Sequence, residues 1–220
     1  MARVARVARV ARVARDYGAD MTVTAPGHPQ QHPAITTEAE LDALYGDPVP
    51  AAVTKELSFI SEDYRAFIEA SPFVLLATAG PEGLDCSPRG ELGGVVRVAD
   101  AHTLLLPDRR GNNRVDSLRN IVRDPRVGLL FLVPGVGETL RANGRASLRT
   151  DEALRRSFAG PDGDKVPTCV IAVEVEAVYI QCPKALTRSQ LWDPAHFVAR
   201  DHLPSVGQMI QRIAGGTVGR

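Results

Sequence analysis

A cluster of basic and polar residues near the middle of the chain has the composition of an anion-binding site. Residues 108–113 contain two arginines and two asparagines, and Arg114 follows them. The apolar run Leu104–Leu106 comes just before and ends at Pro107, which predicts a strand leading into a basic loop. Arginine side chains grip phosphate through paired hydrogen bonds. The loop therefore has the chemistry to bind a phosphate monoester.

A helix is expected to follow this loop and to add its own N-H groups to the site. Asn113 is a suitable N-cap, and apolar residues recur at helical spacing between Val115 and Val122. The helix is predicted to stop at Asp124, because the residue before Pro125 is driven out of the helical region. A helix N-terminus attracts anions. A solvated basic loop before an ordinary helix cap fits the same residues equally well.

A second basic cluster lies near the C-terminus. Lys184, Arg188 and Trp192 are spaced four apart, so that on one helix they would share a face. Two cations beside a large flat ring suit a planar, phosphorylated heteroaromatic ligand. A cationic helix face with Trp192 packed on the protein body is an equally good interpretation.

Short apolar segments separated by tight turns predict an antiparallel sheet. The turns include Gly80–Gly83, Ala99–His102 and Pro134–Gly137. Because closure protects strand edges, the pattern favours a small closed or nearly closed barrel that is mainly β with peripheral helices. The expected strands are Phe73–Ala79, Leu84–Gly90, Val95–Val98, Thr103–Leu106, Arg126–Val133, Glu138–Leu148 and Cys169–Ile180. Helices are expected at Thr37–Tyr45, Thr54–Ala70 and Asp151–Phe158.

Composition excludes several classes of protein. Formal net charge is zero, but the first fifteen residues hold five arginines, so the remainder carries 21 basic and 26 acidic residues. A mildly acidic body argues against a nucleic-acid binder. The five histidines lack metal-ligand spacing, and the three cysteines are far apart, so no metal site or disulfide framework is expected. No apolar run approaches the ~20 residues that span a membrane, and a soluble cytoplasmic protein is predicted.

The chain is long enough for one domain with a sizeable core. Residues 1–33 form an expected disordered Arg-rich tail and linker, since an Ala-Arg-Val repeat of period three gives a helix no apolar face. The domain is placed at 34–205. Residues 206–220 are expected to be a C-terminal tail.

With these blocks in view, the chain resembles the FMN-binding split-barrel family typified by pyridoxamine 5′-phosphate oxidase. The blocks are SPRG, DRRGNNR, DSLRNI, DPRVGLLFL, PGVGETLRANGRA and KALTRSQLW, and the resemblance covers roughly Phe59 to Trp192. It implies a six-stranded antiparallel split β-barrel. It also implies a homodimer with FMN lying across the subunit interface.

The resemblance assigns FMN-binding residues to three blocks. They are Ser87 and Arg89 from the second strand, Pro107, Asp108, Arg109, Asn112, Asn113, Arg114 and Ser117 from the loop and helix, and Lys184, Arg188 and Trp192 from the C-terminal block. Pro107 and Asp108 are placed near the edge of the isoalloxazine ring. Ser117 stands where many relatives have lysine. The oxidase's Trp followed by paired arginines is absent, which argues against pyridoxamine phosphate as substrate.

The resemblance implies an FMN-dependent oxidoreductase acting on a small organic substrate. No residue is identified as a catalytic acid or base. A non-catalytic flavin-binding or flavin-storing protein is the alternative from another functional class. A deazaflavin or haem in place of FMN is a third interpretation.

Overall fold

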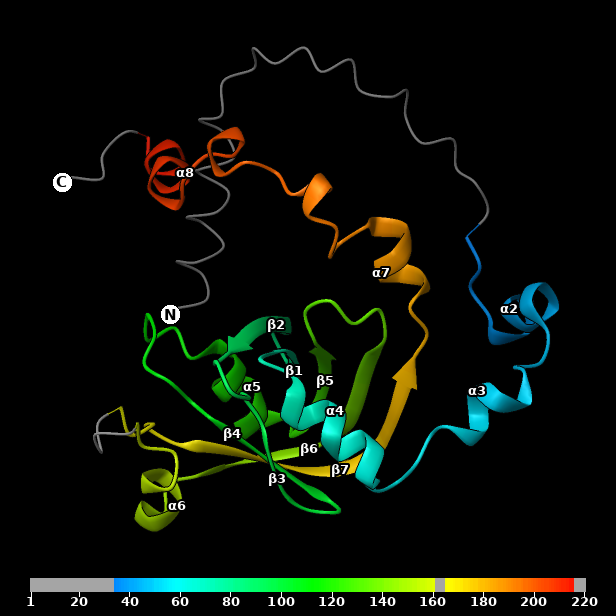
Figure 1. Cartoon of the computed structure of the whole chain (residues 1–220), viewed down its shortest axis with the longest axis horizontal. Coiled ribbons are helices and arrows are strands. Elements are labelled where there is room, and N and C mark those ends of the chain that lie inside the picture. The colour runs from blue at the N-terminus through cyan, green and yellow to red at the C-terminus, as the bar shows by residue number, and fades with distance from the viewer. Residues whose placement is uncertain (1–33, 161–164, 216–220) are drawn as a thin grey trace. The chain divides into compact units, whose positions relative to one another are not determined.

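The computed structural model describes residues 34–160 and 165–215 (Figure 1). The expected Arg-rich tail and linker, residues 1–33, lies outside them, and so do residues 161–164 and 216–220. The chain divides into two compact units. Pro48–His196 contains all of the described strands, and the other unit contains the described residues 34–47 and 197–215. The predicted domain limits, 34–205, stay a prediction.

Seven strands and several short helices make up the described parts. The strands are β1 (Phe73–Gly80), β2 (Gly83–Gly90), β3 (Arg97–Asp100), β4 (Thr103–Pro107), β5 (Arg126–Leu132), β6 (Thr139–Arg149) and β7 (Val170–Gln181). The helices are α2 (Glu38–Tyr45), α3 (Pro50–Thr54), α4 (Glu62–Ala70), α5 (Asp116–Arg123), α6 (Glu152–Arg156), α7 (Lys184–Ser189) and α8 (Val206–Ile213), with 3-10 turns at Pro194–His196 and Arg200–His202.

All strand pairs are antiparallel, and the strand order is β2-β1-β5-β6-β7-β4-β3. β6 and β7 are long enough to pair with each other and with strands on either side, so one half of the sheet continues into the other. This arrangement is the mainly β, split-barrel fold that was predicted. The strand count is seven rather than six, and all seven expected segments form strands.

Ion pairs join the two ends of this sheet, where β2 and β3 are the edge strands. Arg89 on β2 contacts Asp108, the residue after β4, at 3.2 Å. Glu91, just after β2, contacts Arg109 at 2.7 Å. Side chains thus hold the β2 edge to the end of β4.

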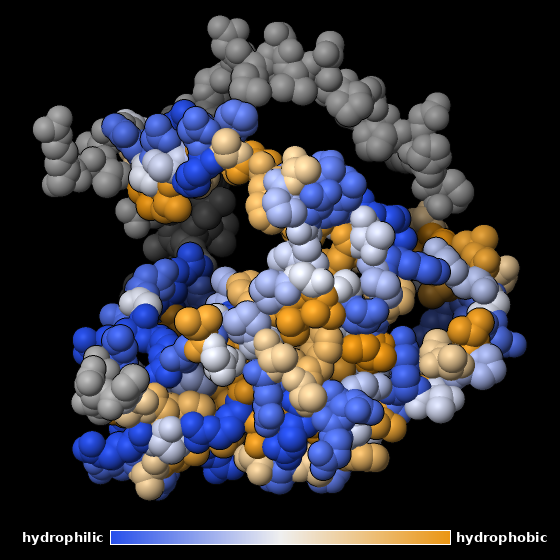
Figure 2. Space-filling view, viewed as in Figure 1, coloured by the Kyte–Doolittle hydropathy of each residue, from blue (hydrophilic) through white to orange (hydrophobic). Residues whose placement is uncertain are grey.

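The core is the apolar interior of the sheet, covered by α4 and α5. Phe131 of β5, Leu76 of β1 and Leu140 of β6 are fully buried, and so is Ile68 of α4. β5 alternates between buried and half-buried residues, as expected of a strand without a wet face. The face shown in Figure 2 has patches of apolar surface between hydrophilic areas.

The prediction of one helix from Thr54 to Ala70 is wrong. Leu57 lies beside β7, where its N-H and carbonyl both bond to Val178 at 3.0 and 2.8 Å. A separate helix, α4, then begins directly after its N-cap Ser61, whose side chain accepts from the Tyr64 N-H. The apolar residues of the intervening stretch are buried by strand-like pairing instead of by a helical face.

Two helices outside the sheet unit begin with capping boxes. In α2, which forms where a helix was expected, the box is Thr37 with Glu40, and the helix ends at Gly46. In α8, a helix within the expected tail at 206–220, the box is Ser205 with Gln208. The sequence did contain a pattern that predicts this helix, because its apolar residues recur three and four apart, at Val206, Met209, Ile210 and Ile213. None of the helices in the described ranges is long and apolar enough to cross a membrane.

Gly144 permits the close contact between β6 and β7. The register of this pair shifts between Asn143 and Gly144, and a Cβ at Gly144 would run into the carbonyl oxygen of Glu174. That oxygen belongs to the backbone of a paired strand, so it has little freedom to move away.

We expect Gly144→Ala to destabilise the protein by ~2 kcal/mol and lower its melting temperature by roughly 4–8 °C. Differential scanning calorimetry measures this. Gly111→Ala is the matched control, since a Cβ there meets nothing within 4 Å. Equal melting temperatures for the two variants would contradict the proposed crowding at Gly144.

Candidate functional site

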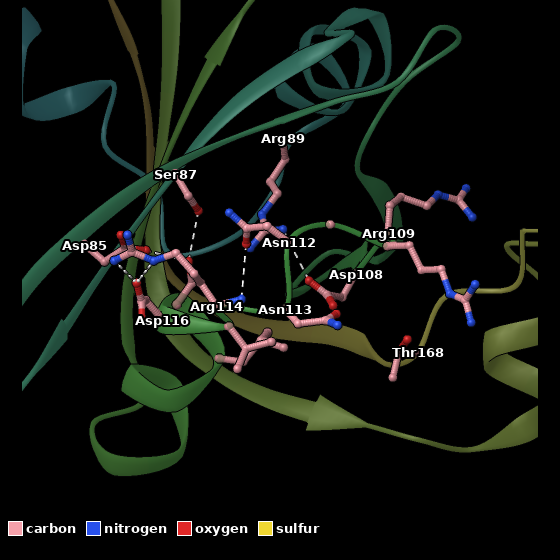
Figure 3. Close-up of a pocket in the computed structure, with 15 residues that line it drawn as sticks. Asp85, Ser87, Arg89, Asp108, Arg109, Asn112, Asn113, Arg114, Asp116 and Thr168 are labelled. Carbon is pink, nitrogen blue, oxygen red and sulfur yellow. Dashed lines mark hydrogen bonds and ion pairs between the residues drawn. The ribbon is translucent and has the colours of Figure 1, made fainter. Parts of the chain in front are cut away.

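A cavity of about 800 Å³ opens where the ends of the sheet meet (Figure 3). That volume suits a cofactor or drug-sized ligand. Its walls come from one face of β2, the loop after β4, the first turn of α5 and the approach to β7. They are formed by Asp85, Ser87, Arg89, Asp108, Arg109, Arg110, Gly111, Asn112, Asn113, Arg114, Val115, Asp116, Ser117, Leu118 and Thr168.

β2 supplies polar groups through the alternation of its side chains. Asp85, Ser87 and Arg89 are two residues apart, so they share the face that lines the cavity. Leu84 and Cys86 lie on the other, exposed face. The sequence D-x-S-x-R of this strand therefore places a carboxyl, a hydroxyl and a guanidinium group in a line along one face.

The loop before α5 has an unusual backbone. The Asn112 side chain accepts from the Arg114 N-H at 3.1 Å, a local turn that Asn favours. Asn113 and Val115 are left-handed, with φ of 60° and 50°. This conformation is strained for a β-branched residue such as Val115, and strain of this kind gathers at functional sites.

The prediction that Asn113 caps the following helix is wrong. The N-cap of α5 is Val115, which has no side chain able to bond the first N-H groups. Asn113 is two residues too early, because the left-handed turns delay the start of the helix. The first turn of α5, with Asp116 and Ser117, lines the cavity without a side-chain cap.

Buried contacts between α5 and β1 position this helix. Asn120 donates from Nδ2 to Thr78 Oγ1 at 3.1 Å, and both residues are buried. A Cβ at Gly80 would collide with the Asn120 side chain, so the glycine lets the helix lie close to the strand. Ser117, one turn before Asn120, is consequently buried at the base of the cavity.

Most arginines of the cavity already have carboxylate partners. Arg89 pairs with Asp108, and Arg114 binds Asp116 at 2.6 Å. Arg109 binds Glu91 and the carbonyl oxygens of Phe158 and Lys165, so its guanidinium is fully engaged in holding loops together. Arg110 is exposed and makes no hydrogen bond or ion pair within the described part of the chain.

The ion pair of Arg89 and Asp108 lies in a part of the cavity wall with little exposure to solvent. Burial raises the pKa of the Asp108 carboxyl, and Arg89 only partly offsets this effect. Burial also raises the pKa of the neighbouring Cys169 thiol, to which the charge of Asp108 adds. The Nε atom of Arg89 is buried without a hydrogen-bond partner in the described structure.

Three side chains of the cavity wall form a hydrogen-bonded chain, and Figure 3 labels two of them, Asp85 and Ser87. Ser117 Oγ donates to Asp85 Oδ2 at 2.6 Å. Ser87 Oγ lies 2.9 Å from Ser117 Oγ. The chain connects the face of β2 to the first turn of α5.

The structure brings two of the three predicted blocks together. The cavity is lined by Ser87, Arg89, Asp108, Arg109, Asn112, Asn113, Arg114 and Ser117. Pro107 is buried at the end of β4 and borders a separate cavity of about 480 Å³ beside Arg109. Lys184, Arg188 and Trp192 do not line the main cavity of their own chain.

The predicted helical stripe of Lys184, Arg188 and Trp192 is wrong. α7 ends at Ser189 and Gln190 is left-handed, so Trp192 lies beyond the helix. Trp192 Nε1 donates to the Val136 carbonyl at 2.9 Å, in the turn between β5 and β6. Lys184 and Arg188 are exposed. The packing interpretation is the one that describes Trp192.

The set of predicted site residues omitted seven that line the cavity: Asp85, Arg110, Gly111, Val115, Asp116, Leu118 and Thr168. The period-two pattern of β2 could have identified Asp85, since it repeats the spacing of Ser87 and Arg89. Arg110 was within the basic loop. Nothing in the local sequence indicated Thr168, which reaches the cavity because its N-H bonds to the Asp108 carbonyl at 3.3 Å.

The raised pKa of Asp108 predicts how stability depends on pH. Because the folded protein holds this proton more tightly than the unfolded chain does, the stabilisation is complete below the ordinary pKa of 3.8 and is lost as pH rises through the folded-state pKa. Asp108→Asn cannot titrate. Wild type should therefore lose stability relative to Asp108→Asn as the pH rises above 3.8. Urea denaturation at a series of pH values measures this, and parallel profiles would contradict it.

Comparison with known proteins agrees with this architecture. The family model described as pyridoxamine 5′-phosphate oxidase matches residues 60–182, more than half of the chain. A search of curated proteins found no match.

Solved structures that are similar to this chain include HupZ of Group A Streptococcus, 19% identical, with a TM-score of 0.45 over 54% of this chain and 91% of that one. General Stress Protein 26 of Bacillus anthracis is 14% identical, with a TM-score of 0.40 over 52% and 88%. The match of the family model over residues 60–182 shows that the chain belongs to the pyridoxamine 5′-phosphate oxidase family.

Proposed function

We propose that the cavity between β2 and α5 binds FMN and that the protein is a cytoplasmic FMN-dependent oxidoreductase acting on a small organic substrate. The observation that carries the proposal is the meeting of the basic loop, the uncapped start of α5 and one polar face of β2 around a single cavity. Family membership supports the same cofactor.

The donor set fits a phosphorylated ligand. Arg110 has no partner in the described structure, and Arg114 is 63% exposed with Asp116 as its one ion-pair partner there, so both can turn toward an anion. The first N-H groups of α5 lack a side-chain cap and carry the positive end of the helix dipole. Arg89 is held by Asp108 and adds a fixed positive charge to the wall.

The residues of the chain bind and orient, while FMN, when bound, supplies the electron-transfer chemistry. Arg110 and Arg114 would hold the phosphate. Asn112 and Asn113 would keep the loop in its bound shape, and Asp108 with Arg89 would close the wall.

Among the alternatives, a flavin is favoured over haem. No described residue that lines the cavity is a histidine, cysteine, methionine or tyrosine, the side chains that ligate haem iron. A protein that binds flavin without turnover would have the same cofactor site as the enzyme, and the two differ only in whether a substrate reacts. Reduction of the yellow protein followed by substrate-dependent reoxidation supports the enzyme, and reoxidation by oxygen alone supports storage.

Removal of a phosphate-binding arginine should weaken FMN selectively. We expect Arg114→Ala or Arg110→Ala to weaken FMN about ten to a hundredfold, because a charge-assisted bond of ~1.4–2.8 kcal/mol corresponds to that range. Riboflavin, which lacks the phosphate, should lose far less. Quenching of flavin fluorescence measures both dissociation constants.

Arg119→Ala is the matched control, because Arg119 is exposed on the same helix and does not line the cavity. Arg89→Ala is less informative, since it also removes the ion-pair partner of the half-buried Asp108 carboxylate. Equal losses of FMN and riboflavin affinity in the Arg114 and Arg110 variants would show that these residues do not hold the phosphate.

We propose that the protein is a homodimer and that the β2 edge lies at the interface. Among the described residues, β2 pairs only with β1, and an unpaired strand edge favours association. Leu84 on β2 is 89% exposed and Leu92, in the loop after it, is 98% exposed. Lys184, Arg188 and Trp192 would then contribute to FMN binding from the second subunit.

Light scattering should give twice the chain mass of 23.6 kDa. Leu92→Asp should shift the protein toward monomer, because the substitution would bury a carboxylate in the interface. Val122→Asp is the control, as Val122 is a similarly exposed residue, on α5. A wild-type monomer with flavin still bound would contradict the dimer.

A further inference from the structure

The ion pair of Arg114 and Asp116 differs in geometry from two other arginine–carboxylate pairs of the described chain. Arg114 donates from both Nε and NH2 to a single oxygen of Asp116, Oδ2, at 2.8 and 2.6 Å (Figure 3). Arg109 and Arg126 also donate from Nε and NH2, but each spreads these bonds over both oxygens of its carboxylate partner. A guanidinium matches an anion best when parallel bonds reach two oxygens. The Arg114 pair falls short of that match.

A left-handed residue brings these two side chains together. Residues two apart on a helix do not face each other, but Val115, which stands between Arg114 and Asp116, has a φ of 50°. This conformation is strained for a β-branched residue. Asp116 also lies in the first turn of α5, where the positive end of the helix dipole attracts anions. One carboxylate therefore takes both of the attractions that this part of the cavity offers to a phosphate.

We propose that Asp116 is a built-in competitor of the ligand's phosphate, and that a bound phosphate takes its place on Arg114. A phosphate monoester has a charge of about −2 at neutral pH and three acceptor oxygens, so Nε and NH2 can each reach a separate oxygen. NH1 of Arg114 makes no hydrogen bond within the described residues and remains for a further oxygen. The inference rests on the proposed function and refines it, since it names what the phosphate displaces.

Solvent exposure identifies this pair as the one that exchanges. The side chains of Arg114 and Asp116 are 63% and 33% exposed. Those of Arg89 and Asp108, a second ion pair of the cavity wall, are 23% and 14% exposed. Water can hydrate an Asp116 carboxylate that leaves Arg114, whereas Asp108 would lose its partner in a part of the wall with little solvent. The Arg114 backbone stays in place, because its N-H donates to Asn112 Oδ1.

Asp116→Asn tests the competition, because it keeps the size of the side chain and removes its charge. We expect the preference for FMN over riboflavin to rise about five- to tenfold, since only FMN has the phosphate that gains Arg114. Quenching of flavin fluorescence gives both dissociation constants. A fall in the preference would mean that Asp116 orients Arg114 for the phosphate, and it would overturn the inference. An unchanged preference would overturn it as well, whether or not the two affinities move together.

Asp124→Asn is the matched control, at the other end of α5. Asp124 binds Arg126, two residues away, through Nε and NH2, as Asp116 binds Arg114, and neither Asp124 nor Arg126 lines the cavity. The control removes the same charge beside the same helix and should leave the preference for FMN unchanged. An equal rise in both variants would assign the effect to overall charge and overturn the inference.

Inorganic phosphate separates this inference from the proposed function, because the measurement needs no flavin. At equal ionic strength, phosphate should raise the melting temperature of Asp116→Asn about twice as much as that of wild type or Asp124→Asn, since a ligand stabilises the form that it binds. Equal shifts in the three proteins would overturn the competition and leave the proposed function standing. If wild type binds neither FMN nor riboflavin, the proposed function fails, and the phosphate shifts alone decide the inference.

Discussion

The ion pair between Arg89 and Asp108 is the interaction on which the site depends. In the part of the chain that the structure describes, the ends of the sheet are not joined by strand pairing, and this pair, together with Arg109 and Glu91, connects the β2 edge to the end of β4. Burial works against the Asp108 charge, as its raised pKa shows. A half-buried pair of this kind stabilises little by itself, but the loss of one partner would leave an uncompensated charge in the wall. The closure is therefore specific in geometry and sensitive to substitution.

A cavity at the junction follows from closing a sheet with side chains instead of backbone bonds. Side-chain contacts leave gaps that strand ladders do not. The polar groups that line those gaps are partly buried, so they must pair with one another. The carboxylates Asp85, Asp108 and Asp116 lie among the arginines and neutralise much of their charge. The site is consequently less basic than the sequence of the loop indicates, and the identity of its unpaired groups matters more than the number of arginines.

Much of the fold could be predicted from the sequence, because alternation and turn residues mark the strands and Thr37 with Glu40 marks α2. The errors arose where tertiary contacts prevailed over local pattern. Leu57 fits a helical stripe but pairs with Val178, and Asn113 is a good cap in a loop whose left-handed turns delay the helix. For the site, residue types indicated Arg114, whereas Ser87 was predicted only through the family resemblance. Local sequence could not show that Asp108 would engage Arg89, or that Trp192 would pack on the turn at Val136, since both contacts join distant segments.

The alternation along β2 has a consequence for how this chain can diverge. One added residue between Gly83 and Asp85 would shift the register of the following β2 residues by one position, and the side chains of the two faces of the strand would be exchanged. The cavity would then receive Cys86 and Pro88, a thiol and a ring without polar atoms, in place of the serine and arginine. Two added residues would restore the parity. Insertions here should thus be accepted in even numbers among descendants that keep a polar cavity, whereas the turn at Pro81 and Glu82 is free to vary in length.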